Sequence, residues 1–346
     1  MIHDQVELHN IAELVTVPGR PGLRCQRVPE AVRQHLNPKA QVRTLQPANC
    51  EIRFVSDGDT ARVTLSCPEG TAEVIPFFGG FQSRERLAIG PEPRQLDLAY
   101  PPRLRALVPE VADDMAFHPR VWRLTVRGDG LHWHGIEGSG LRPPTAEELP
   151  RTRYLAYGTS ITHGGAASAA HLTYAAQAAH SFGADLLNLG VGGSAYCEPE
   201  LAEYMAGRED WDVASLCLSV NMIGGGFTTQ QFTERARHMV RVMAEADPVR
   251  PVLCFSILPY FADVCCDVDG PHGQGLAPAF RRALEEIAYD GGWPNVHFTP
   301  GSDLMSDLSG HTPDVLHPGD YGMMEIGRRL GYRLGELAAA AALQGG

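Results

Sequence analysis

The sequence predicts a chain in two parts: an antiparallel β-sandwich, followed by a doubly wound α/β domain with a parallel sheet. From about residue 40 to residue 137, short alternating apolar runs are separated by turn residues, which is typical of a sandwich. After Arg151, apolar runs of strand length alternate with helical runs, which indicates a parallel sheet covered on both faces. Residues 139–151, rich in proline and glycine, indicate a linker. We therefore expect domains at residues 1–148 and 149–346.

In the first part, the pattern predicts one short helix and a series of strands. Residues 29–36 have the composition of a short helix. The clearest strands are expected at residues 51–55, 61–65, 72–77 and 121–126. Turn signals such as Ser56-Asp57-Gly58-Asp59 separate them.

In the second part, strands and helices alternate in order. Strands are expected at residues 154–157, 185–189, 213–220, 252–258 and 296–298. Helices are expected at residues 171–182, 228–246, 277–288 and 321–341. The helix at 228–246 has the clearest spacing, since Phe232, Met239 and Met243 fall on one face. Gly183 and Pro248 are suitable stop signals for the first two helices.

Composition and charge exclude several classes of protein. With 44% hydrophobic and 20% charged residues, the chain is expected to be globular rather than disordered. A formal net charge of −12 opposes nonspecific binding to nucleic acid and to anionic lipid surfaces. No apolar run is long enough for a membrane-spanning helix. No secretory signal is visible after Met1, so we expect a cytoplasmic protein.

The eight cysteines do not form a recognisable metal motif. No CxxC pair is present, and the adjacent Cys265 and Cys266 with His272 do not complete a zinc site. We expect reduced, structural thiols and neither a metal nor an organic cofactor. Cys197 is kept as an alternative nucleophile.

Polar and glycine residues follow the first two predicted strands of the second part. Ligands of open α/β sheets bind beyond the carboxyl ends of the strands. Ser160 follows the first strand in Gly158-Thr159-Ser160, where free N–H groups at a helix start could stabilise an oxyanion. Gly193 ends a glycine-rich segment after the second strand and could bring another N–H to a ligand. Taken singly, Ser160 could equally be a helix cap and the glycines a tight turn.

Two further segments supply an amide and a base. Asn221 follows the third strand, and its side-chain NH₂ can donate to an oxyanion, although a turn-forming role explains it as well. His317 precedes the last helix, and Asp314 is placed three residues before it, within reach of the imidazole on a tight turn. A serine nucleophile needs such a base, and the base needs an orienting partner.

Together these segments resemble the SGNH/GDSL hydrolases. Gly158-Thr159-Ser160 resembles the first block of that family, Gly193 the second and Asn221 the third, while Asp314 and His317 resemble the last. The resemblance extends over about residues 151–334 and points to a subgroup with an N-terminal β domain. Two positions depart from the family pattern, since Thr159 replaces an aspartate and Met222 follows Asn221 where the family has aspartate.

The resemblance implies a fold and a chemistry. The fold would be a flavodoxin-like α/β/α domain with a five-stranded parallel sheet, preceded by a jelly-roll-like sandwich. Ser160 would be the nucleophile, His317 its base and Asp314 the orienting acid, with Ser160, Gly193 and Asn221 as the oxyanion hole. His163 and Met222 are candidate substrate contacts, although each could simply pack in the core.

The sequence defines the substrate less clearly than it defines the reaction. We expect a small-molecule ester, and among these a small-acyl (acetyl-type) ester of a carbohydrate or other polar alcohol. A lipid-side acyl hydrolase, such as a thioesterase, lysophospholipase or lipase, is the alternative, and a binding protein that kept the fold is the third reading. No nucleic acid or membrane partner is expected, and the sequence leaves a homo-oligomer open.

Overall fold

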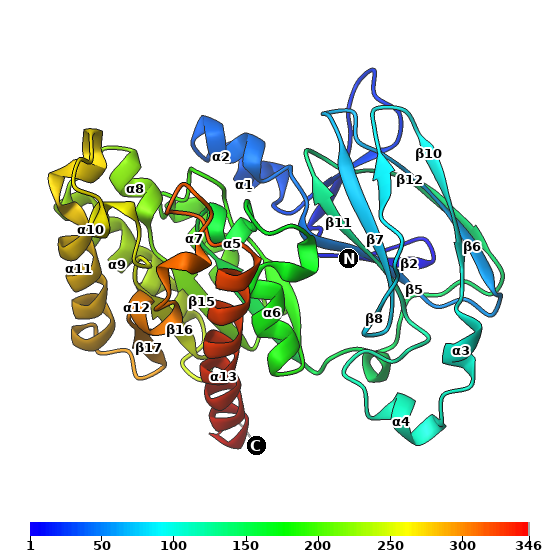
Figure 1. Cartoon of the computed structure of the whole chain (residues 1–346). Coiled ribbons are helices and arrows are strands. Elements are labelled where there is room, and N and C mark those ends of the chain that lie inside the picture. Colours follow the sequence, from blue (N-terminus) through cyan, green and yellow to red (C-terminus); the bar gives the residue numbers. More distant parts are fainter. Residues whose placement is uncertain (345–346) are drawn as a thin grey trace. The chain divides into compact units, whose positions relative to one another are not determined.

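The computed structural model describes residues 1–344, and the chain divides into two compact units (Figure 1). The first unit contains residues 1–30 and 44–151, and the second contains residues 31–43 together with the chain from residue 152 onward. Residues 31–43, which the sequence placed in the N-terminal domain, therefore group with the second unit.

Two antiparallel sheets form the first unit. One has the strand order β1-β2-β5-β11-β7-β8 with β9 also paired to β7, and the other has the order β10-β6-β12-β4-β3. The strands of the first sheet are β1 (Ile2–His3), β2 (Val6–His9), β5 (Ala48–Phe54), β7 (Ala72–Phe78), β8 (Phe81–Gln82), β9 (Leu87–Ile89) and β11 (Trp122–Gly128). Those of the second are β3 (Glu13–Thr16), β4 (Leu23–Gln26), β6 (Thr60–Ser66), β10 (Arg94–Ala99) and β12 (His132–Gly138).

Side chains from both sheets share one apolar core, as the sandwich prediction requires. Ile52 and Phe54 from β5 join Val63 and Leu65 from β6 in this cluster, and all four are fully buried. Trp122 stacks on Phe54 with ring centroids 5.3 Å apart. Two short helices, α3 (Pro102–Arg105) and α4 (Pro109–Asp113), follow β10.

A five-stranded parallel sheet forms the centre of the second unit, which confirms the predicted fold class. Its strand order is β14-β13-β15-β16-β17. The strands are β13 (Thr152–Tyr157), β14 (Ala184–Asn188), β15 (Val213–Cys217), β16 (Val252–Phe255) and β17 (Val296–Thr299). Since the chain passes from β13 to one neighbour and then to the other, the topological switch point lies at the carboxyl end of β13.

Helices bury both faces of this sheet. Tyr154 and Ala156 pack into a cluster with residues of α6 and α13, while Leu155, which points to the opposite face, is also fully buried. On the second face α9 packs against both α7 and α11. The helices are α1 (Glu30–Arg33), α2 (Pro38–Arg43), α5 (Ser160–His163), α6 (Tyr174–Ser181), α7 (Pro199–Ala206), α8 (Val220–Gly224), α9 (Thr229–Ala246), α10 (Phe261–Val264), α11 (Leu276–Asp290), α12 (Gly301–Leu304) and α13 (Asp320–Gln344).

Local hydrogen bonds explain where two elements differ from the expected bounds. The helix expected from residue 171 begins at Tyr174, because the Thr173 side chain caps it by accepting a hydrogen bond from the N–H of Ala176 at 3.2 Å. The third strand of the sheet ends at Cys217 because the chain turns into α8 at Val220.

The structure also shows the state of the cysteines and the character of the helices. The eight cysteines all lie within residues 1–344 as free thiols, and only Cys265 and Cys266 are exposed. Within the same range, none of the helices combines the length and apolar character needed to cross a membrane.

Candidate active site

Ser160 lies at the switch point, on the first turn of the short helix α5. The chain leaves β13 at Tyr157 and turns at Gly158, where an added methyl group would lie 2.3 Å from Oγ1 of Thr162 and 2.7 Å from Cβ of Cys217. Thr159 is fully buried and caps the helix by accepting a hydrogen bond from the N–H of Ile161 at 3.3 Å. The threonine that replaces the family aspartate is therefore part of the helix start.

Asp314 and His317 occupy a tight turn just before α13. Oδ2 of Asp314 lies 2.6 Å from Nδ1 of His317, while its Oδ1 accepts hydrogen bonds from the N–H groups of Leu316 and His317, both at 2.9 Å. The turn forces Val315 to a φ of 51°. Positive φ is strained for a β-branched residue, so the local backbone is held in a conformation that serves this contact.

The environment of Asp314 favours its charged form. Partial burial alone would raise the pKa of this carboxyl group, but hydrogen bonds from the backbone and ring of His317, and from Leu316 and Thr312, lower the pKa well below its usual value. The carboxylate is thus available to orient the imidazole and to stabilise an imidazolium.

The structure brings the serine and the histidine together although 157 residues separate them. Oγ of Ser160 lies 2.7 Å from Nε2 of His317. With Nδ1 directed at the carboxylate of Asp314, Nε2 is the nitrogen that can accept the hydroxyl proton. A serine hydroxyl, an imidazole and a carboxylate therefore lie in one hydrogen-bonded chain, which is the arrangement needed for nucleophilic attack.

Three hydrogen-bond donors on the segments that follow β13, β14 and β15 are without acceptors within residues 1–344. Oδ1 of Asn221 accepts a hydrogen bond from the N–H of Ala195 at 3.2 Å, which fixes the amide and leaves its NH₂ group to point elsewhere. Among residues 1–344, no acceptor is bonded to that NH₂ group or to the N–H groups of Ser160 and Gly193. Gly193 has a φ of +68°, which glycine adopts without strain. Unsatisfied donors of this kind are suited to a developing oxyanion.

Asn188 connects the loops that carry Ser160 and Gly193, a role that the sequence reasoning did not assign. It is fully buried at the end of β14. Its Nδ2 donates to the carbonyl of Thr162 at 2.7 Å, and its Oδ1 accepts from the N–H of Gly190 at 2.9 Å. A buried asparagine directly before a glycine-rich turn was the available signal.

Three other candidate residues, His163, Met222 and Cys197, pack against other groups or are buried. Nδ1 of His163 lies 3.1 Å from the carbonyl oxygen of Gly190, so this ring packs between the two loops. Met222 is fully buried in the core rather than on a substrate-facing surface. Cys197 is also fully buried, and burial raises the pKa of its thiol well above the usual value, which opposes a role as nucleophile.

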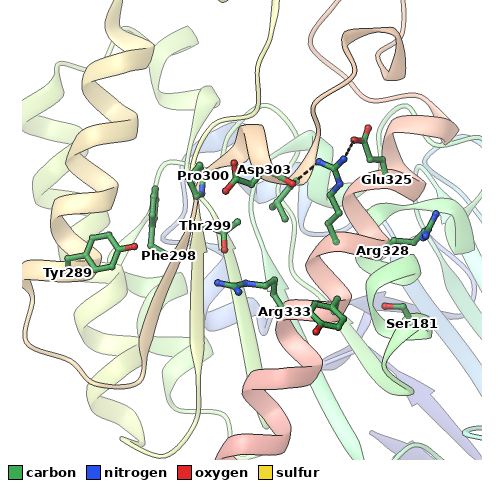
Figure 2. Close-up of a pocket in the computed structure, with 12 residues that line it drawn as sticks. Ser181, Tyr289, Phe298, Thr299, Pro300, Asp303, Glu325, Arg328 and Arg333 are labelled. Carbon is green, nitrogen blue, oxygen red and sulfur yellow. Dashed lines mark hydrogen bonds and ion pairs between the residues drawn. The ribbon is translucent and has the colours of Figure 1, made fainter.

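Two cavities of the second unit differ in where they lie relative to Ser160. A small apolar cavity of about 10 Å³ is lined by Ile161, Val220 and Leu316, the sequence neighbours of Ser160, Asn221 and His317. A much larger open cavity of about 1030 Å³ lies along β17 and α13 and contains none of these residues (Figure 2). The larger cavity is therefore separate from the serine and histidine.

Over the described range 1–344, histidine, cysteine, aspartate and glutamate side chains do not gather in groups of three or more that could hold a metal ion.

Comparisons with known proteins show which family the second half of the sequence matches and which solved structures share the fold. Residues 152–331 match the model of the GDSL-like Lipase/Acylhydrolase family. A search of the curated proteins found no match.

Solved structures resemble the chain over nearly its whole length. The salicylyl-acyltransferase SsfX3 from a tetracycline biosynthetic pathway is similar at 18% identity and a TM-score of 0.67, covering 98% of this chain and 95% of that one. A family two carbohydrate esterase from Clostridium thermocellum, in complex with cellohexaose, is similar at 13% identity and 0.61, covering 96% and 98%. The acetyl xylan esterase Est2A from Butyrivibrio proteoclasticus is similar at 12% and 0.57, covering 96% of each chain.

Proposed function

Because the chain belongs to the GDSL-like lipase/acylhydrolase family and is a carboxylic ester hydrolase, we propose that Ser160, His317 and Asp314 form its catalytic triad. The observation that carries the proposal is the 2.7 Å separation of Ser160 Oγ and His317 Nε2. Both groups lie at the carboxyl end of β13, where open α/β sheets bind their ligands.

The reaction would proceed through an acyl-enzyme. Nε2 of His317 takes the proton from Ser160 as Oγ attacks the ester carbonyl, and the proton then passes to the leaving alcohol. Water, activated by the same imidazole, attacks the acyl group in the second half and restores the serine. Asp314 keeps the imidazole in the required tautomer throughout and stabilises its transient positive charge.

The oxyanion of each tetrahedral intermediate would be held by the N–H groups of Ser160 and Gly193 and by the side-chain NH₂ group of Asn221. The absence of acceptors for these donors within the described chain supports this assignment, since buried or partly buried donors are usually paired. One such donor is worth about 2.7–4 kcal/mol in a transition state.

We further propose a small acyl group on a carbohydrate or other polar alcohol. The similarity in fold to carbohydrate esterases and an acetyl xylan esterase supports the same substrate class.

An acyl-chain series tests both levels of the proposal. The kcat/KM should be highest for 4-nitrophenyl acetate and should fall steeply towards the octanoate. Acetylated sugars such as acetylated xylose should release acetate. A profile that rises towards the octanoate would instead favour the lipid-side alternative.

The nucleophile is identified by labelling. A fluorophosphonate should modify Ser160, as peptide mass spectrometry would report, and Ser160→Ala should remove both the label and the turnover. Cys197→Ala is the matched control and should keep both. Labelling that persists in Ser160→Ala would place the nucleophile elsewhere.

A further inference from the structure

Helix α2 is fixed beside the proposed oxyanion hole by Asn37. The side-chain amide of Asn37 donates to the carbonyl of Ser194 at 3.1 Å and to the carboxylate of Glu198. Its Oδ1 accepts hydrogen bonds from the N–H groups of Lys39 and Ala40, at 3.1 and 3.0 Å, and so begins the helix. A segment that precedes most of the sandwich in sequence is thereby held against the loop after β14.

Two cationic side chains of α2 face the glycines of that loop. Lys39 and Arg43 are four residues apart and share one side of the helix. A methyl group added to Gly193 would lie 2.5 Å from Nζ of Lys39. One added to Gly192 would lie 3.8 Å from both Cδ of Arg43 and Cβ of Ser160. The two cations therefore flank the turn whose N–H is assigned to the oxyanion.

Lys39 is chemically distinct within this chain. It is the only lysine among the 29 lysine and arginine residues of the sequence. Its side chain is exposed, and its ammonium group has no hydrogen-bond or ion-pair partner in the part of the chain that the structure describes. An ammonium group is a compact charge with three rotatable donors, which suits an anion that approaches from solvent.

Glu198 is the acidic group that bonds to Asn37 at the start of this helix. Glu198 is buried and accepts hydrogen bonds from Asn37 and from the N–H of Tyr196. Burial raises the pKa of Glu198, although these hydrogen bonds and Arg235 oppose the rise. Helix α2 thus presents positive charge beside Gly193, in a protein whose net charge is −12.

We propose that Lys39, assisted by Arg43, recognises an anionic group on the substrate, so that the enzyme prefers esters bearing a carboxylate near the scissile carbonyl over neutral esters of the same shape. This inference rests on the proposed function of Ser160. It narrows the substrate class to acyl or alcohol groups with a negative charge within a few ångströms of the oxyanion hole.

Matched pairs of esters test the preference and locate the charge. On the acyl side, monoethyl succinate is compared with ethyl 4-methylpentanoate; on the alcohol side, 4-acetoxybenzoate is compared with 4-acetoxybenzamide. In one of these pairs, Lys39→Gln should lower the ratio of kcat/KM for anionic over neutral ester by roughly 10- to 100-fold, mainly through KM. Lys39→Arg should restore most of the ratio, and salt should reduce it in the wild type.

A surface charge of the same sign provides the control. Arg241→Gln removes one exposed positive charge from α9, where Arg241 pairs with Glu245, and should leave both ratios unchanged. The proposal is overturned if Lys39→Gln leaves both ratios unchanged. It is overturned equally if the variant slows anionic and neutral esters alike, because that result would make the ammonium a general stabiliser of the oxyanion.

A binding measurement separates this inference from the proposed function. As the sole lysine, Lys39 can be acetylated selectively by an N-hydroxysuccinimide ester and followed by peptide mass spectrometry, with the Met1 amine as an internal reference. In Ser160→Ala, the anionic ester should slow acetylation of Lys39, while its neutral partner should not. Protection without turnover in the wild type would refute the proposed function alone, and equal protection by both esters would refute the recognition of charge.

Discussion

The carboxylate of Asp314 contacts His317 at two points: Oδ2 lies 2.6 Å from the ring nitrogen Nδ1, and Oδ1 accepts a hydrogen bond from the backbone N–H at 2.9 Å. The first contact selects the tautomer of the ring, and the second fixes the turn that carries it. One side chain therefore determines both the protonation pattern and the position of the proposed base.

Replacing Asp314 by asparagine should reduce kcat by about 10⁴-fold, because the amide cannot stabilise the imidazolium and favours the wrong tautomer. Turnover of 4-nitrophenyl acetate measures this loss, and circular dichroism should show an unchanged fold. The exposed Asp267→Asn serves as the control and should retain full activity. A loss of less than tenfold in Asp314→Asn would contradict the orienting role.

Asn221→Ala should lower kcat by about 10²- to 10³-fold with little change in KM, since the lost donor acts on the oxyanion and not on the bound ester. Steady-state kinetics with the acetyl ester give both constants. The control is Gln230→Ala, which deletes an exposed side-chain amide of α9 and should behave as wild type. Wild-type turnover in Asn221→Ala would exclude its amide from the oxyanion hole.

Asn188→Ala should destabilise the fold by about 2–3 kcal/mol, because it leaves the N–H of Gly190 and the carbonyl of Thr162 without the partner that each has now. Urea unfolding followed by tryptophan fluorescence measures the loss as a lower midpoint at constant slope. Since the same bonds join the loops of Ser160 and Gly193, activity should fall as well. Unchanged stability would show that these loops hold their positions without Asn188.

The first unit should lose stability in acid through Glu51. Burial alone would raise the pKa of Glu51, but the guanidinium groups of Arg123 and Arg53 lower it from 4.5 to about 2. The stability that this carboxylate contributes is therefore complete above about pH 4.5 and is lost as the pH falls towards 2.

Hydrogen exchange of β5 and β11 at pH 7 and pH 3 measures this effect. Protection in the wild type should drop strongly over that interval. In Glu51→Gln protection should already be lower at pH 7 and should change less with pH. An equal drop in both proteins would assign the acid sensitivity to other groups, such as Glu7, whose pKa is also lowered to about 2.

The strands and helices of the second unit were predictable because their signals are local. Apolar runs such as residues 154–157 must be buried, and the helix at Thr229–Ala246 carries its apolar spacing in its own sequence. The order of the motifs along the chain then placed Ser160, Gly193 and Asn221 after successive strands. Parallel strands bring such positions to one edge, so their proximity follows from topology.

Other positions could not be predicted, because their environment comes from distant segments. The role of Asn188 depends on the carbonyl of Thr162, and Met222, within the short helix α8, is fully buried. At Asn188 the local signal is an asparagine before a glycine-rich turn, and that signal does not show which distant group the side chain bonds to. Helix and strand propensities and the spacing of apolar residues do not identify such distant partners.

The proposed reacting groups could be found from the sequence, because Ser160 follows a strand in a short motif and Asp314 and His317 are three residues apart. The surroundings of these groups depend on the tertiary structure. Lys39 reaches Gly193 because Asn37 bonds to Ser194 and Glu198, more than 150 residues away. The physical reason is that long-range hydrogen bonds and burial, rather than local backbone preference, fix a six-residue helix that is too short to be stable alone.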